Sequence, residues 1–335
     1  MKKNQWILLF ILSQGFLLQT ALAAMPQNPL VNGESLYVSH NGIYKFNQAT
    51  LEQEWSALQG LQTFEPVMGN NLLYVGSSQG LYALDADTGE QVWRIEEART
   101  IFSPSVAGQL YAGSLHGDLY SINPHSGKIN WQQQFSGWIY SPVVLPDQDQ
   151  LWTGGQAHQA LALSTKDGRL LHTVMLDQES IFSPLYLQNE QVAFNLFNGK
   201  TAIINTVTAK VDGWLNGSTQ PKNINFDARF IYRSNRDGTL TAFDRNNYRV
   251  EWQQSIVAQD LTMHPTAGGH ILMSDLDKIL VLFDPIKRTE VWRKQISGNW
   301  FAPAQIDTKS IIYIQSSNLQ PNNLSAVKVY ARPPK

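Results

Sequence analysis

A unit of roughly 38 residues recurs along almost the whole chain, and this repeat constrains the fold more than any other feature. Each unit opens on a proline, apart from one that opens near Phe226. After each opening come short runs rich in Val, Ile, Leu, Tyr and Phe, separated by Gly, Asn, Asp and Ser. Such runs predict β-strands joined by tight turns. The opening prolines are Pro29, Pro66, Pro104, Pro142, Pro184, Pro265 and Pro303.

Most units also close on a tryptophan, while His172 takes that place in the fourth unit. Four-stranded units in series predict a propeller, because one blade cannot bury both of its faces without neighbours. We therefore predict an all-β fold, an eight-bladed β-propeller of four-stranded antiparallel blades, forming one domain over residues 24–335. The large indoles are predicted to fill the space between blades. These closing residues are Trp55, Trp93, Trp131, Trp214, Trp252 and Trp292.

The last unit contains only three strand-like segments, at Pro303, at residues 311–314 and at residues 326–330, and has no closing tryptophan. We expect a last blade of three strands, with residues 24–28 as the alternative source of a fourth. A ring of seven blades is a further alternative, but it would leave predicted strands unassigned.

The first 23 residues have the features of a secretory signal. Lys2 and Lys3 precede an apolar run over residues 6–18, and small residues stand at Ala21 and Ala23. This pattern predicts a cleaved signal peptide over residues 1–23, with an uncleaved anchor as the alternative. We expect a periplasmic mature chain without a transmembrane segment. Because the sequence has no cysteine, we expect neither disulfides nor a lipid-modified N-terminal cysteine.

Composition and motifs argue against several classes of function. The net charge of −2 at pH 7 lacks the basic excess of a nucleic-acid binder. No nucleophile elbow, phosphate loop or paired carboxylates at catalytic spacing is present, so we predict no catalytic residues, cofactor or metal. His40, His116 and His158 are predicted to be solvated turn residues rather than metal ligands. Asp275 and Asp277 resemble a fragment of a calcium loop whose other ligands are missing.

The second unit carries the sharpest motif, with Ala83, Asp85, Thr88, Gly89 and Trp93. It resembles the tryptophan-docking motif of the quinoprotein (pyrroloquinoline quinone) propeller superfamily. The resemblance implies that the indole of one blade stacks on the Ala and Gly segment of the next, and that the Asp and Thr close the turn by hydrogen bonds. The other units match it only in part.

Within that superfamily, the compact units are most similar to the BamB branch. The resemblance implies a cofactor-free, non-enzymatic and monomeric scaffold that binds a protein partner in the cell envelope, in envelope or outer-membrane protein biogenesis. The chain departs from that branch in lacking the lipoprotein cysteine. The alternatives are a quinone-dependent oxidoreductase and a glycan-binding propeller. An exposed strand edge could accept an extended client segment by β-augmentation.

Aromatic residues recur two positions before the opening prolines, where the chain enters the innermost strands. They either pack between blades near the hub or form an exposed binding mouth, and aromatic residues are enriched at binding hot spots. Trp138 and Trp300 lie in the same connections but outside the shared pattern. The candidate binding mouth comprises Phe64, Phe102, Trp138, Tyr140, Phe182, Trp300 and Phe301.

Overall fold

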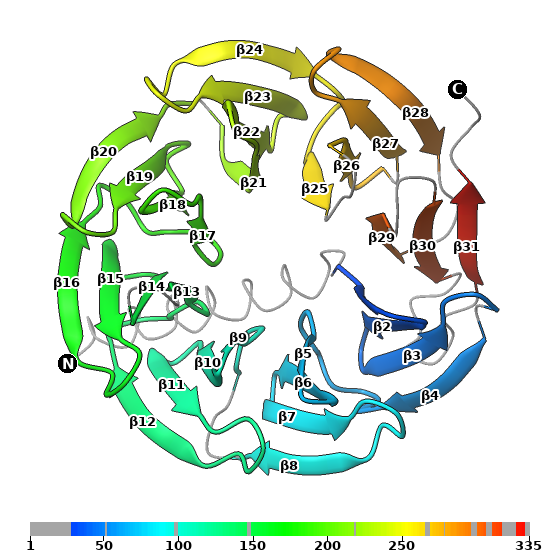
Figure 1. Cartoon of the computed structure of the whole chain (residues 1–335). Helices are drawn as coiled ribbons and strands as arrows, with labels where there is room; N and C mark the ends of the chain where they lie inside the picture. Colours follow the sequence, from blue (N-terminus) through cyan, green and yellow to red (C-terminus); the bar gives the residue numbers. More distant parts are fainter. Residues whose placement is uncertain are drawn as a thin grey trace, which may run out of the picture.

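The computed structural model describes residues 28–331, apart from residues 51, 97–99, 146–148, 218, 265–268, 278, 296–299, 306–309 and 317–325, and from residue 300 onward only the backbone. The predicted signal peptide, residues 1–23, lies outside these residues. The described chain forms a ring of antiparallel sheets around a central axis (Figure 1). Each sheet runs outward from the axis, and its first strand is the innermost.

Seven of the sheets are complete blades with four strands each. Blade 1 contains β1–β4, and each later blade takes the next four strands in order. The bounds are β1 (Leu30–Asn32), β2 (Ser35–Ser39), β3 (Ile43–Asn47), β4 (Gln53–Ala57), β5 (Val67–Gly69), β6 (Leu72–Ser77), β7 (Gly80–Asp85), β8 (Gln91–Ile95), β9 (Ser105–Ala107), β10 (Gln109–Gly113), β11 (Asp118–Ile122), β12 (Ile129–Gln134), β13 (Val143–Leu145), β14 (Gln150–Gly154), β15 (Gln159–Ser164), β16 (Leu170–Met175), β17 (Leu185–Tyr186), β18 (Gln191–Asn195), β19 (Thr201–Asn205), β20 (Lys210–Leu215), β21 (Pro221–Phe226), β22 (Phe230–Asn235), β23 (Thr239–Asp244), β24 (Val250–Ser255), β25 (Thr262–His264), β26 (Ile271–Ser274), β27 (Ile279–Asp284) and β28 (Thr289–Gln295).

The prediction of an eight-bladed propeller is wrong. The propeller has seven four-stranded antiparallel blades, and the last unit forms only a three-stranded sheet of β29 (Trp300–Gln305), β30 (Ser310–Ser316) and β31 (Ala326–Ala331). In Figure 1 this sheet lies between blade 7 and blade 1. The physical reason lies in the sequence, since the last unit has no closing segment with a tryptophan to pair with β31.

Burial follows position within a blade. The second and third strands are buried on both faces, as in β6, where Leu73, Tyr74 and Val75 are fully buried. The outer strands alternate between buried and exposed residues, as in β12 and β24. Each large hydrophobic cluster joins two neighbouring blades, for example blades 2 and 3 or blades 4 and 5. The core is therefore a series of seams, each a contact surface between two blades, rather than one central nucleus.

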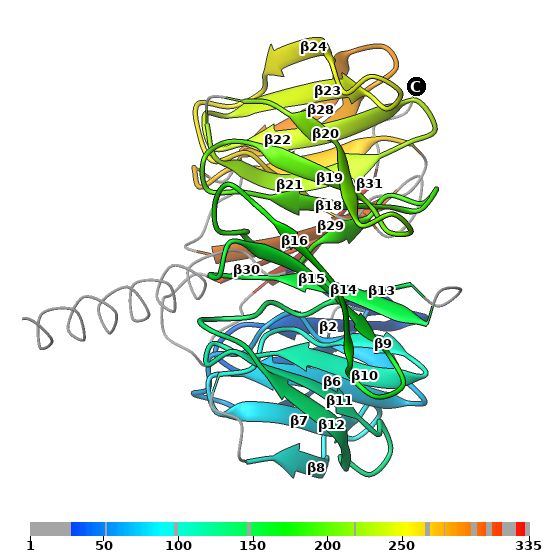
Figure 2. The same cartoon turned by 90° about the vertical axis from the view of Figure 1, so that its left-hand side faces the viewer.

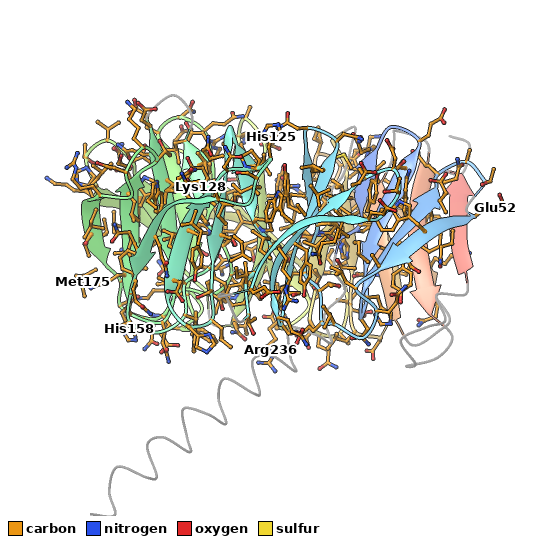
Figure 3. The ribbon with its side chains drawn as sticks, turned by 90° about the horizontal axis from the view of Figure 1, so that it is seen from below. Glu52, His125, Lys128, His158, Met175 and Arg236 are labelled. Atoms are coloured by element: carbon orange, nitrogen blue, oxygen red, sulfur yellow. The ribbon has the colours of Figure 1, made fainter. Side chains whose placement is uncertain are left out.

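The turns of the blades gather on the two faces of the ring, which Figure 2 shows edge-on. One face carries the turns between third and fourth strands, where His125 and Lys128 lie (Figure 3). The opposite face carries the turns between second and third strands, and His158, Met175 and Arg236 lie there.

Candidate functional site

The motif of the second unit forms a tied turn. The Asp85 carboxylate accepts hydrogen bonds from the backbone N–H of Thr88 at 2.8 Å, the hydroxyl of Thr88 at 3.1 Å and the N–H of Asp87 at 3.0 Å. The backbone hydrogen bond from Thr88 is the largest of the effects that lower the pKa of Asp85. Gly89 follows with φ of +76°, a conformation that favours glycine.

Three consecutive seams place an indole on such a glycine: Trp55 on Gly89, Trp93 on Gly127 and Trp131 on Gly168. A β-carbon at these glycines would lie only 2.6–2.8 Å from the nearest indole carbon, so a larger residue would displace the ring. Each indole also donates its N–H to a backbone carbonyl of the same turn, at 3.3 Å for Ala86, 2.9 Å for Pro124 and 3.0 Å for Thr165.

In the later seams the turn glycine is replaced, and in the seam between blades 4 and 5 the tryptophan is replaced as well. His172 stands in the tryptophan position beside Ala162, and the corresponding turn of blade 5 has Ala209 at φ of +51°. In the next seam the turn residue is Tyr248, whose ring lies against Gly213, where a β-carbon would fall 2.0 Å from it. Trp252 then meets Arg288, whose guanidinium lies 5.6 Å from the indole centroid. Trp292 lies in β28, partly buried beside Leu280 and Leu282.

Most rings of the predicted binding mouth pack against one another between blades. Phe64, Phe102, Tyr140 and Phe182 follow one another from blade to blade in an arc. The ring centroids of successive blades lie 5.6 Å apart for Phe64 and Phe102, 5.2 Å for Phe102 and Tyr140, and 6.4 Å for Tyr140 and Phe182. Trp138 packs with this cluster, and only Phe182 is partly exposed. Burial raises the pKa of Tyr140. The side chains of Trp300 and Phe301 lie outside the described residues. The arc thus presents little surface to a partner.

The candidate metal ligands are not brought together. In the part of the chain that the structure describes, no group of three or more His, Asp or Glu side chains could hold a metal ion. His158 lies 4.0 Å from the Glu179 carboxylate. Burial lowers the pKa of His40, and Asp275 accepts a hydrogen bond from the N–H of Ile279 at 2.8 Å.

A buried polar network near the axis was missed by sequence reasoning. His264 in β25 is 3% exposed, and its Nδ1 lies 2.8 Å from Asn28 Oδ1 while its Nε2 lies 2.6 Å from Ser274 Oγ. The backbone N–H of Asn28 donates to the Glu65 carboxylate at 2.9 Å. Asn28 thus joins blade 7 to the segment that enters blade 2. No local motif signals it, because Asn28 and His264 are 236 residues apart.

The outer strand of blade 4 differs from the other outer strands of the complete blades. β16, with sequence LLHTVM, contains no charged residue, and Leu170 and Met175 are 47% and 66% exposed. β12 is also uncharged, but its exposed residues are Asn130, Gln132 and Gln134. The remaining five outer strands each carry at least one charged side chain. This difference could have been found by comparing the closing segments of the repeat.

These features define a β-propeller of the quinoprotein-like superfamily, held together by tryptophan-docking seams. The chain belongs to the family described as outer membrane protein assembly factor BamB, whose model matches residues 14–100 and 77–211, more than half of the sequence. No curated protein matches the chain.

Solved structures share the fold at low identity. BamB from Moraxella catarrhalis is 15% identical, with a TM-score of 0.70 over 92% of this chain and 96% of its own. The computationally designed Ika8 protein is 9% identical, with a TM-score of 0.76 over the same shares. The dihydro-heme d1 dehydrogenase NirN, in complex with DHE, is 14% identical, with a TM-score of 0.69 over 82% of this chain and 68% of its own. An assembly factor and a dehydrogenase share the fold, so the fold alone does not separate binding from catalysis.

Proposed function

We propose that this chain is an exported, non-enzymatic scaffold that binds extended protein segments during outer-membrane protein assembly, and that the outer edge of β16 is the binding surface. Family membership supports the protein-binding role at the level of the family. The observation that carries the choice of surface is the exposed, uncharged β16, with Leu170 and Met175 pointing to solvent.

The edge of a sheet presents unpaired backbone groups, and proteins usually protect such edges with charged residues. The backbone N–H of Leu176 donates to the backbone carbonyl of His158 at 2.8 Å. In this register Met175 lies opposite Gln159 and Thr173 lies opposite Leu161. Antiparallel residue pairs alternate between hydrogen-bonded and non-hydrogen-bonded, and Leu176 with His158 is a hydrogen-bonded pair. The backbone N–H and C=O groups of Thr173 and Met175 therefore face away from β15. An added strand would bond to these groups and contact the exposed side chains.

The end of this edge continues onto the face where Met175 lies (Figure 3). There Phe197 donates its N–H to the carbonyl of Glu179 at 3.2 Å and is 39% exposed. A shallow groove runs from Phe197 past Gln220 to Arg236. A client strand that leaves β16 would therefore meet the apolar side chain of Phe197 and then a polar groove that contains both Arg236 and Asp237, which suits a segment with alternating apolar and polar residues.

Binding of a fluorescent ten-residue peptide with a β-barrel strand pattern, followed by anisotropy, tests the proposal. Thr173→Pro removes an outward N–H, and Met175→Lys introduces a charge of the kind that five of the other outer strands carry. Each should weaken binding at least tenfold. The matched controls are Gln132→Pro in β12 and Val92→Lys in β8, where Val92 is 50% exposed. Equal affinity of all four variants would refute the choice of edge.

The cellular role is tested separately. Cells that lack the chain should have less folded β-barrel protein in the outer membrane, and the wild-type chain, but not Thr173→Pro, should restore it. Unchanged barrel levels in the deletion strain would refute the role in assembly, whatever the peptide binding shows.

A further inference from the structure

We propose that the seam between blades 3 and 4 contains a binding pocket for a neutral carbohydrate, independent of the β16 edge. The pocket is open to solvent and has a volume of about 470 Å³, within the range of small-ligand sites. It is lined by Gln109, Tyr111, Ser121, Asn130, Thr165 and Lys166.

The seam between blades 1 and 2 shows why this space is open. There Lys45, 7% exposed, pairs with Trp55 across the strands and extends its ammonium to Glu54 at 2.9 Å and to Asp87 at 3.9 Å. Tyr37 lies beside Trp55 with ring centroids 5.9 Å apart. The lysine side chain and its two carboxylates thus occupy the seam.

The same positions have different residues in the seam between blades 3 and 4. Ser121 pairs with Trp131 where Lys45 pairs with Trp55, and Tyr111 lies 6.0 Å from Trp131. Asn130 precedes the tryptophan where Glu54 does, and Lys166 stands where Asp87 does. With a serine in place of the lysine, the volume of that long side chain is left unfilled.

Apart from Lys166, the lining side chains are neutral and offer both donors and acceptors. Asn130 Nδ2 donates to Gln109 Oε1 at 2.8 Å and to Ser121 Oγ at 3.4 Å. Among the described residues this leaves Gln109 Nε2 as a donor and Asn130 Oδ1 as an acceptor. The Lys166 ammonium at the rim already pairs with Asp149 at 2.6 Å, so the pocket has no unmatched charge to select an anion or a cation.

A sugar satisfies these groups because each hydroxyl can donate and accept at once. Because the Lys166 ammonium is paired with the Asp149 carboxylate, neither an acidic nor a basic ligand finds an unpaired opposite charge there. The ring of Tyr111, which packs against Trp131, lines the pocket beside the polar groups. A neutral hydroxyl-rich ligand is therefore the class that this lining selects.

Saturation-transfer NMR with glucose, mannose, N-acetylglucosamine and their disaccharides tests the pocket, with glutarate and lysine as charged competitors. At least one sugar should give a saturable signal. The triple variant Ser121→Lys, Asn130→Glu and Lys166→Asp reproduces the lysine and two carboxylates of the seam between blades 1 and 2. It should close the pocket and reduce the affinity for the sugar at least tenfold. Lys128→Ala, on the nearby exposed turn (Figure 3), should bind as the wild type does.

If the triple variant does not fold, as judged by its thermal transition, Gln109→Ala supplies the same test through loss of one donor. The proposal is overturned if no sugar binds, if only glutarate or lysine binds, or if the folded triple variant, or Gln109→Ala in its place, binds sugar as the wild type does. None of these outcomes depends on peptide binding at β16.

Discussion

Lowering the pH should destabilise this propeller through His264. Burial lowers the pKa of His264 in the folded chain to about 3, from an ordinary value of 6.5. The neutral ring suits its partners, because Nδ1–H can donate to Asn28 Oδ1 while Nε2 accepts from the Ser274 hydroxyl. When the chain unfolds, the imidazole returns to water and regains its ordinary pKa.

The sign follows from proton uptake. Between pH 6.5 and pH 3 the unfolded histidine binds a proton that the folded one does not, so stability falls as the pH falls through this window. From pH 7 to pH 5 the loss amounts to about 2 kcal/mol, from 1.36 kcal/mol per pKa unit. Glu65 acts in the opposite sense, since burial raises its pKa and its contribution to stability is lost as the pH rises.

Urea unfolding at pH 7, 6 and 5, followed by tryptophan fluorescence, checks this prediction. His264→Gln should be less stable than the wild type at pH 7, and that difference should shrink by about 2 kcal/mol at pH 5. Ser274→Ala keeps the histidine and should retain the steep pH dependence of the wild type. A stability difference between wild type and His264→Gln that stays constant from pH 7 to pH 5 would refute the reasoning.

Two further pairs of substitutions probe the seams by urea denaturation. Gly127→Ala should cost about 2–4 kcal/mol, because it combines a positive φ with a β-carbon 2.8 Å from Trp93, whereas Gly108→Ala, at a similar φ with open space around it, should cost about 1–2 kcal/mol; equal losses would contradict the docking contact. Arg233→Met should cost about 2–4 kcal/mol, because the 2%-exposed guanidinium donates to the carbonyls of Gly199, Leu215 and Asn216. Arg233→Lys should recover only part of that loss, and full recovery would show that charge alone suffices.

The sequence was sufficient to predict the propeller class, because strand-forming runs and closing tryptophans recur at a fixed period. It was not sufficient to predict the number of blades, since counting the openings treated as a blade the last unit, which has no closing strand. The aromatic residues before the prolines could not be assigned from the sequence either. Their burial depends on the neighbouring blade, as the contact between Phe102 and Tyr140 shows, and the repeat does not specify how closely two blades approach.

The buried polar network near the axis could not be predicted from the sequence for a different reason. It depends on Asn28 and His264, which come together only when the ring closes. By contrast, the uncharged β16 could be read from the sequence once the outer strands were aligned, because edge protection is a property of composition.

The variation among seams suggests how one propeller can carry stability and binding together. In a repeat architecture each interface is shared by only two units, so one seam can change while the others keep their contacts. The turn glycine of the first three seams gives way to other residues in the later seams, as where the Tyr248 ring lies against Gly213. Likewise, Lys45 fills one seam whereas Ser121 leaves the corresponding space open. A pocket can therefore be placed in a single seam, because the indole of Trp131 still docks on Gly168 in that same seam and holds the blades together.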